Sequence, residues 1–258
     1  MVTRRNLLKQ VGAAAVGAAI AGTASARVAA PQSLEIGSAG SLHALTDALA
    51  RAPRKRTFKT VPMILTHPSE WDSEALDLLL HYRAAPKQVW DNTALASPWL
   101  NLMRNAMNTQ IWSFHHANFL CVSATHGSAH LALYDAFIWD KYQLSKLTKG
   151  KFNHNPFIGT PKAAHADAKN YEDAEGVFSP HDNSITVLQR RGAVFLACHN
   201  EVWELTMKLH QKGVNPDHLA HDRMAAEFTN HIIPGAVLTP GIVGTLPELE
   251  LAGFQYAK

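Results

Sequence analysis

The chain is poor in cysteine and lacks the common cofactor and nucleotide motifs. Among its 258 residues only Cys121 and Cys198 carry a thiol, too few for a disulfide scaffold. There is no CxxC pair, no CxxCH haem sequence and no four-cysteine iron–sulfur pattern. A P-loop, a GxGxxG and a GxSxG are also missing, which argues against nucleotide, dinucleotide and lipase-type chemistry. No cofactor is therefore expected from the motifs.

Long apolar runs and an excess of charge are missing as well. Charged residues make up 17% of the chain and hydrophobic residues 47%, which is typical of globular proteins. The Gly/Ala-rich run at 11–22 is too short and too weak to span a bilayer, so no stable membrane insertion is expected. The only basic cluster, RAPRKRTFK at 51–59, contains a proline. We interpret it as a solvated linker rather than a binding patch.

The first 26 residues have the three ordered parts of an export signal. A twin-arginine sequence, TRRNLLK, is followed by the apolar run and then by ASA, a cleavage signal ending at Ala26. This order resembles a bacterial twin-arginine (Tat) signal and predicts a periplasmic protein. Removing residues 1–26 takes away Arg4, Arg5 and Lys9 and no acid, so the formal charge falls from +3 to zero. Nothing then favours nucleic acid as a partner.

Downstream of the signal, apolar strand patterns alternate with amphipathic helix patterns. We expect residues 27–86 to form an extension with one helix, which packs on a main domain formed by residues 87–258. The strand candidates are KQVWDN, ANFLCVSA, AVFLACH, GAVLTPG and FQYAK, and a helix pattern follows each of the first four. The alternation predicts a three-layer α/β/α domain with a mostly parallel five-stranded sheet. Residues 148–183 read as an insertion that acts as a lid or an assembly arm, or is disordered.

Ligands bind beyond the carboxyl ends of the strands in such sheets. Two segments of this chain follow a strand directly and are expected to share that edge. They supply the candidate site residues: Thr125, His126, Gly127, Ser128, Cys198, His199 and Asn200.

Cys198 is the candidate for chemistry because it is expected to end a strand immediately before a helix. The free N–H groups and partial positive charge of a helix start lower the pKa of a thiol placed there. His199 adds a base or a cation. We therefore expect the pKa of Cys198 to lie below the usual value of about 8.5, although a buried core cysteine remains the alternative. Cys121 lies within an apolar run, so we expect it to fill the core and to form no bridge with Cys198.

The histidines offer a second hypothesis. His126 and His199 are both expected at the ligand edge, where they would hold a metal or a small anion. No histidine spacing in the chain matches a tight metal motif such as HExxH, so a metal set is not defined by the sequence.

Several segments resemble the DsrE/DsrF-like family. They are AVFLACHNEVWEL, then IIPGAVLTPGIVGTLPELELAGFQYAK, with KQVWDN and VSATHGSAHLAL matching the first strand and the His-Gly turn after the second. The resemblance covers roughly residues 87–258. It implies a flavodoxin-like fold and assembly into trimers or hexamers. It also implies that Cys198 carries persulfide sulfur between proteins, with small sulfur species or a sulfur-relay protein as partner.

Three hypotheses follow. The leading one is an exported protein that handles sulfur species or thiols through Cys198 and His199. The others are a non-catalytic periplasmic module that binds a small ligand or metal, and an assembly protein whose site has lost its function. Whether the chain is an enzyme is left open.

Overall fold

The computed structural model describes residues 33–159 and 169–258, all within one compact unit that spans 32–258. The expected export signal lies outside the described residues. Within the described ranges no helix is long and apolar enough to cross a membrane.

A five-stranded parallel sheet forms the middle layer, as the alternating pattern predicts. Its strands run in the order β4-β3-β2-β1-β5. They are β1 (Lys87–Asn92), β2 (Leu120–Thr125), β3 (Val194–Cys198), β4 (Val237–Thr239) and β5 (Gln255–Ala257). Strands β2 and β3 are buried along their whole length, which explains their continuous apolar runs. The three-layer α/β fold is confirmed, but its strand order differs from the 2-1-3-4-5 order of flavodoxin.

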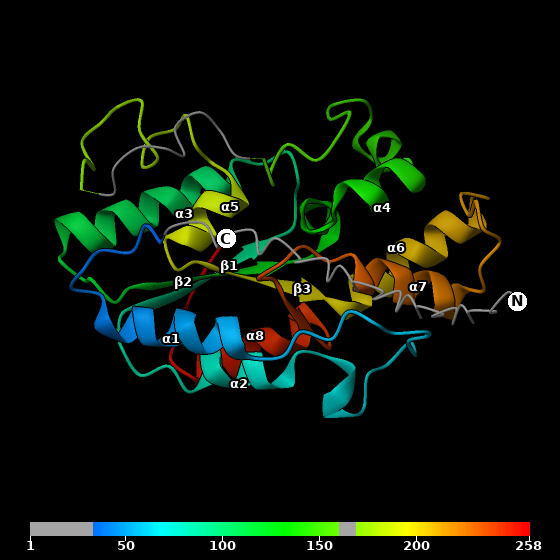
Figure 1. Cartoon of the computed structure of the whole chain (residues 1–258), viewed down its shortest axis with the longest axis horizontal. Coiled ribbons are helices and arrows are strands. Elements are labelled where there is room, and N and C mark those ends of the chain that lie inside the picture. The colour runs from blue at the N-terminus through cyan, green and yellow to red at the C-terminus, as the bar shows by residue number, and fades with distance from the viewer. Residues whose placement is uncertain (1–32, 160–168) are drawn as a thin grey trace, which may run out of the picture. The chain divides into compact units, whose positions relative to one another are not determined.

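Helices cover both faces of the sheet (Figure 1). One face is covered by α3 (Trp99–Asn108), α4 (Ala136–Lys141), α5 (Ile185–Arg190), α6 (His199–Gln211) and α7 (His221–Asn230). The other face is covered by α1 (Gly40–Arg51), α2 (Ser73–Leu80) and α8 (Ile242–Leu251). Two of these last three helices belong to the N-terminal extension, where the sequence predicts one. The extension is therefore a part of the second helical layer.

The two cysteines lie on opposite faces of the sheet. Side chains alternate between the faces along a strand. Cys121 consequently packs among the residues under α3 to α7, whereas Cys198 packs among those under α1, α2 and α8. Both thiols are free, so the expectation that no bridge joins them is confirmed.

The helix pattern after β2 is divided into three short helices in the structure. It forms a 3-10 helix at Gly127–Leu133, then α4, then a second 3-10 helix at Leu144–Thr148. Tyr134 interrupts it by forming an isolated bridge with Ile232, and Asp135 then caps α4 by accepting from the N–H of Ile138. Short turns also occur at Pro68–Glu70 (3-10) and Thr109–Ser113 (π).

The insertion at 148–183 contacts the helical layer that contains α3 and α5. Phe178 and Val177 pack with Leu34 and Val187, and Arg104 on α3 donates to the carbonyl of Phe178 at 2.8 Å. Part of the insertion, 160–168, lies outside the described residues. The described part therefore packs against α3 and α5, and its expected role as lid or assembly arm stays a prediction.

Candidate functional site

The carboxyl ends of β1 to β4 bring the two predicted segments together. Thr125 pairs with Asn92 on one side and with Ala197 on the other, and Cys198 pairs with Thr239. Continuing the β2–β3 register by one residue sets His126 beside Cys198. The candidate residues thus gather at one edge of the sheet, although their side chains face different partners.

Cys198 ends β3 and caps α6, as the sequence predicts. Its Sγ accepts the backbone N–H of Glu201 at 3.4 Å and that of Ile242 at 3.3 Å. These donors lie in the first turns of α6 and α8, so two helix starts point at one sulfur. Only 4% of Cys198 is exposed.

The expected low pKa of this thiol is wrong in sign. Burial raises the pKa of Cys198 above its usual value, and the charge of Glu201 raises it further. The N–H groups of Ile242, Glu201 and Asn200 lower it without overcoming these effects. The thiol is therefore protonated near neutral pH. For comparison, burial raises the pKa of Cys121 to about 12, in keeping with its place in the core.

His199 is directed away from the sulfur. It is fully buried, and its Nε2 donates to the carbonyl of Pro62 at 2.8 Å, in the N-terminal extension. Within the described ranges its Nδ1 has no partner and no hydrogen bond joins it to Cys198. Burial lowers the pKa of His199, so the ring is neutral. The predicted catalytic partnership between His199 and Cys198 is not supported by this geometry.

His126 belongs to a polar cluster at the end of β1 whose other members, Asp91, Tyr256 and Lys258, are not among the residues predicted from the sequence. Its Nε2 lies 2.7 Å from Asp91 Oδ1, and Tyr256 on β5 donates to Asp91 Oδ2, also at 2.7 Å. Lys258 Nζ lies 3.7 Å from the same oxygen. Although burial opposes it, the hydrogen bonds from His126 and Tyr256 lower the pKa of Asp91. The carboxylate is therefore ionised.

This cluster lies where the fold predicts a ligand crevice. The connections from β1 to β4 run in one direction across the sheet, whereas β5 returns to the other side of β1. Open α/β sheets bind ligands at such a switch point, outside the carboxyl ends of the strands. Asp91 lies at the carboxyl end of β1. The rule that ligands bind beyond the carboxyl ends of strands, which identified the other two segments, therefore also points to Asp91.

The remaining predicted residues shape the turn after β2. Gly127 has φ +54° and donates its N–H to Glu201 Oε2 at 2.9 Å, which links the turn to α6. Ser128 Oγ accepts from the N–H of Leu95 at 3.0 Å and so braces the loop after β1. Thr125 is fully buried and its Oγ1 lies 2.7 Å from Ser123 Oγ, so its side chain does not face a ligand.

Asn200 is the exposed residue of the first turn of α6. A Cβ added at Gly241 would lie 2.6 Å from Asn200 Nδ2. The glycine therefore leaves room for this amide beside the start of α8.

His130 and its ring neighbour Tyr134 each have a buried polar atom without a partner among the described residues. His130 Nε2 accepts the backbone N–H of Cys198 at 3.0 Å, while His130 Nδ1 has no partner in the described part of the chain. Burial lowers the pKa of His130 to about 3, so it is neutral. The buried hydroxyl of Tyr134 is also unpaired there, and burial, with the charges of Glu201 and Cys198, raises its pKa well above the usual value.

The two histidines of the expected metal pair contact different partners. His126 contacts Asp91 and His199 contacts Pro62. No group of three or more His, Cys, Asp or Glu side chains among the described residues is arranged to hold a metal ion.

A scan against protein-family models, a search of curated proteins and a search of solved structures each gave no match. The DsrE-like resemblance therefore stays a prediction that rests on the sequence segments.

Proposed function

We propose that this protein handles sulfane sulfur or thiols through Cys198. The observation that carries the proposal is the pair of N–H groups, from Glu201 and Ile242, that converge on Sγ at the carboxyl edge of the sheet. Such donors stabilise a sulfur anion more than a neutral thiol. They therefore favour the thiolate of Cys198, the form that attacks a sulfur donor.

The reaction class is persulfide exchange. The thiolate of Cys198 attacks the outer sulfur of a persulfide, R–S–SH. A new S–S bond forms at Cys198 as the donor's S–S bond breaks, and R–S⁻ leaves as a thiolate. The protein then carries Cys198–S–SH, and attack by an acceptor thiolate on the outer sulfur returns the free thiolate of Cys198. No net oxidant or reductant is consumed.

The burial of Cys198 suits a protein that carries bound sulfur better than one that needs a fast nucleophile. A thiol with a raised pKa reacts slowly by itself, because little thiolate is present near neutral pH. The same burial shields bound sulfur from unrelated thiols. Cys198 is then reached by a small sulfur donor, or by a partner protein whose binding opens the carboxyl edge of the sheet.

The proposal also includes export through the Tat route and a homo-oligomer, a trimer or hexamer. The support for both is the sequence: the signal pattern, and a mature chain of zero formal charge that resembles an oligomeric family. Light scattering that gives a clean monomer at micromolar concentration would contradict the assembly part.

The experiment is sulfur loading by glutathione persulfide, followed by intact-protein and peptide mass spectrometry. We expect wild type and Cys121→Ser to gain the mass of one sulfur atom, on the peptide that contains Cys198. Cys198→Ser should gain none. Loading of Cys121 alone, or no loading of the folded wild type, contradicts the proposal.

A second candidate function is a non-catalytic module that binds a small ligand at the same edge. The observation that favours it is the Asp91–His126–Tyr256 cluster at the switch point of the sheet. If this candidate is correct, Asp91→Asn and His126→Gln abolish binding of a ligand that co-purifies with the protein, while Cys198→Ser leaves it unchanged.

A further inference from the structure

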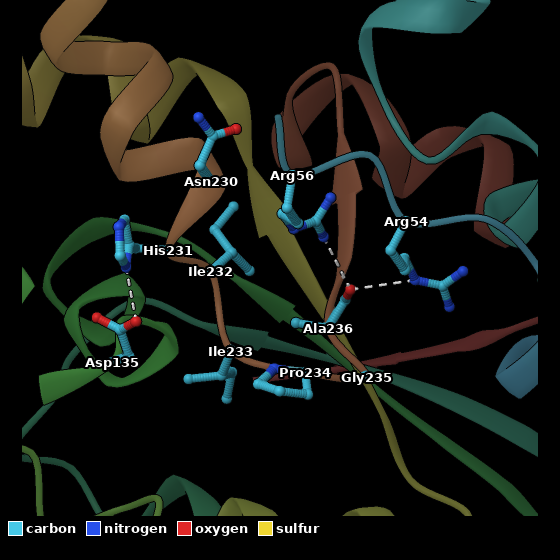
Figure 2. Close-up of a pocket in the computed structure, with 10 residues that line it drawn as sticks. All are labelled: Arg54, Arg56, Asp135, Asn230, His231, Ile232, Ile233, Pro234, Gly235 and Ala236. Carbon is cyan, nitrogen blue, oxygen red and sulfur yellow. Dashed lines mark hydrogen bonds and ion pairs between the residues drawn. The ribbon is translucent and has the colours of Figure 1, made fainter. Parts of the chain in front are cut away.

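A pocket of about 420 Å³ lies beside the start of β4, apart from the candidate site (Figure 2). It is bounded by the basic segment at Arg54 and Arg56, by Asp135, and by the chain at 230–236. Ala236 precedes β4, whereas Cys198 pairs with Thr239 at the other end of that strand. Its volume is in the range of small-molecule sites.

Two arginines share one carboxylate at this pocket. Arg56 binds both oxygens of Asp72, at 3.0 and 2.8 Å. Arg54 Nε lies 3.7 Å from Asp72 Oδ2, and both arginines donate to the carbonyl of Ala236 at 3.3 Å. Each arginine side chain is 17% exposed. The interpretation of this segment as a solvated linker is therefore wrong for Arg54 and Arg56.

Among the described residues, Arg54 and Arg56 share Asp72 as their one carboxylate, which leaves a net positive charge at this wall. Burial lowers the pKa of Arg54, the charge of Arg56 lowers it further, and Asp72 opposes this in part. Within the described part of the chain, Arg54 Nη2 makes no hydrogen bond. This nitrogen is not among the fully buried polar atoms that lack a partner, so it is open to an anion from solvent.

The polar groups on the opposite side of the pocket already have hydrogen-bond partners. Asp135 Oδ2 lies 2.7 Å from His231 Nδ1, and its Oδ1 accepts the N–H of Ile138 at the start of α4. Figure 2 shows this pair across from the two arginines, with Ile233 and Pro234 between the two sides. The pocket thus offers positive charge on one side and apolar surface next to it.

We propose that this pocket binds a small organic anion, with its charged group at Arg54 and Arg56 and its apolar part against Ile233 and Pro234. Guanidinium groups make short, charge-assisted hydrogen bonds to carboxylates, which suits a carboxylate ligand. The site is independent of the chemistry at Cys198.

The test uses benzoate as the anionic probe and benzyl alcohol as its neutral counterpart, with binding measured by calorimetry. We expect benzoate to bind the wild type at least tenfold more tightly than benzyl alcohol. Arg54→Gln should weaken benzoate binding about tenfold or more, because it removes the net positive charge that Arg54 and Arg56 leave at the pocket. Arg51→Gln, which removes an exposed charge from the end of α1 outside the pocket, should leave it unchanged.

A second measurement covers the case in which Arg54→Gln does not fold. Benzoate should shift the backbone amide NMR signals of Gly235 and Ala236 in the wild type and in Cys198→Ser, and leave those around Cys198 in place. Equal binding of the two probes, equal loss in Arg51→Gln, or no shift at Gly235 and Ala236 would each overturn the proposal. None of these results bears on sulfur loading.

Discussion

Two acidic groups, the thiol of Cys198 and the carboxyl of Glu201, share the start of α6. Burial raises the pKa of each, and the charge of Glu201 raises that of Cys198 further. The carboxylate is held there by the N–H of Gly127. The charge of Glu201 therefore disfavours the thiolate form of Cys198, whereas the N–H groups at the two helix starts favour it.

Replacing Glu201 by glutamine should remove the charge that disfavours the thiolate of Cys198. An amide oxygen still accepts from Gly127, but the negative charge beside the sulfur is gone, so the pKa of Cys198 should fall. We expect alkylation of native Glu201→Gln at neutral pH to be several-fold faster than that of the wild type, because each pKa unit changes the thiolate fraction about tenfold. Glu204→Gln, an exposed neighbour on α6, is the matched control and should react like the wild type. Slower alkylation of Glu201→Gln would mean that the carboxylate accepts the thiol proton instead.

The position of Cys198 in the fold could be predicted from the sequence, but the direction of its pKa shift could not. An apolar run that ends in Cys-His-Asn before a helix pattern locates the residue at the edge of the sheet. The donor Ile242 lies 44 positions further along the chain, and Tyr256 lies 165 positions from Asp91. Contacts between such distant segments, and the burial they produce, have no signature in the local pattern.

Among the elements, the buried strands were the most predictable. β2 and β3 lie where their apolar runs predict, because a strand covered on both faces must be apolar throughout. The segment after β2 was less predictable. Its helical pattern is broken by a bridge between Tyr134 and Ile232, a tertiary contact that overrides the local periodicity.

The turn between β2 and the following 3-10 helix should tolerate no side chain at Gly127. A Cβ there would lie 2.7 Å from the backbone oxygen of Thr93, and φ is +54°. Gly127→Ala should therefore add backbone strain and a steric clash to the folded state, which together lower the free energy of unfolding by about 2 kcal/mol or more.

Gly150→Ala separates these two effects. Gly150 also has a left-handed φ, +77°, but nothing lies within 4 Å of its Cβ position. Only the strain, about 1 kcal/mol, should appear in its urea unfolding curve. Equal losses for the two variants would show that contact with Thr93 does not constrain the turn.

For the whole molecule, the N-terminal extension contains two helices where the sequence predicts one. Helices α1 and α2 pack with α8 against one face of the sheet, so the extension belongs to the same compact unit as the sheet. A sequence boundary near Lys87 therefore does not separate two structural units.

Export of this molecule should depend on the twin arginines. Changing Arg4 and Arg5 together to lysine keeps the charge but removes the pattern that the Tat route recognises. We expect the full-length variant to stay in the cytoplasm, with little in the periplasmic fraction by immunoblot. An unchanged periplasmic yield would contradict the assignment of a Tat signal.

The central claim is that Cys198 works as a thiol and Cys121 fills the core. Alkylation of the native protein across a pH series, with each labelled cysteine located by mass, tests it most directly. We predict that Cys198 is labelled first, with a midpoint above the usual thiol pKa of about 8.5 because burial raises it. Cys121 should be labelled only after denaturation. Labelling of Cys121 first, or of neither cysteine in the native protein, would contradict the account.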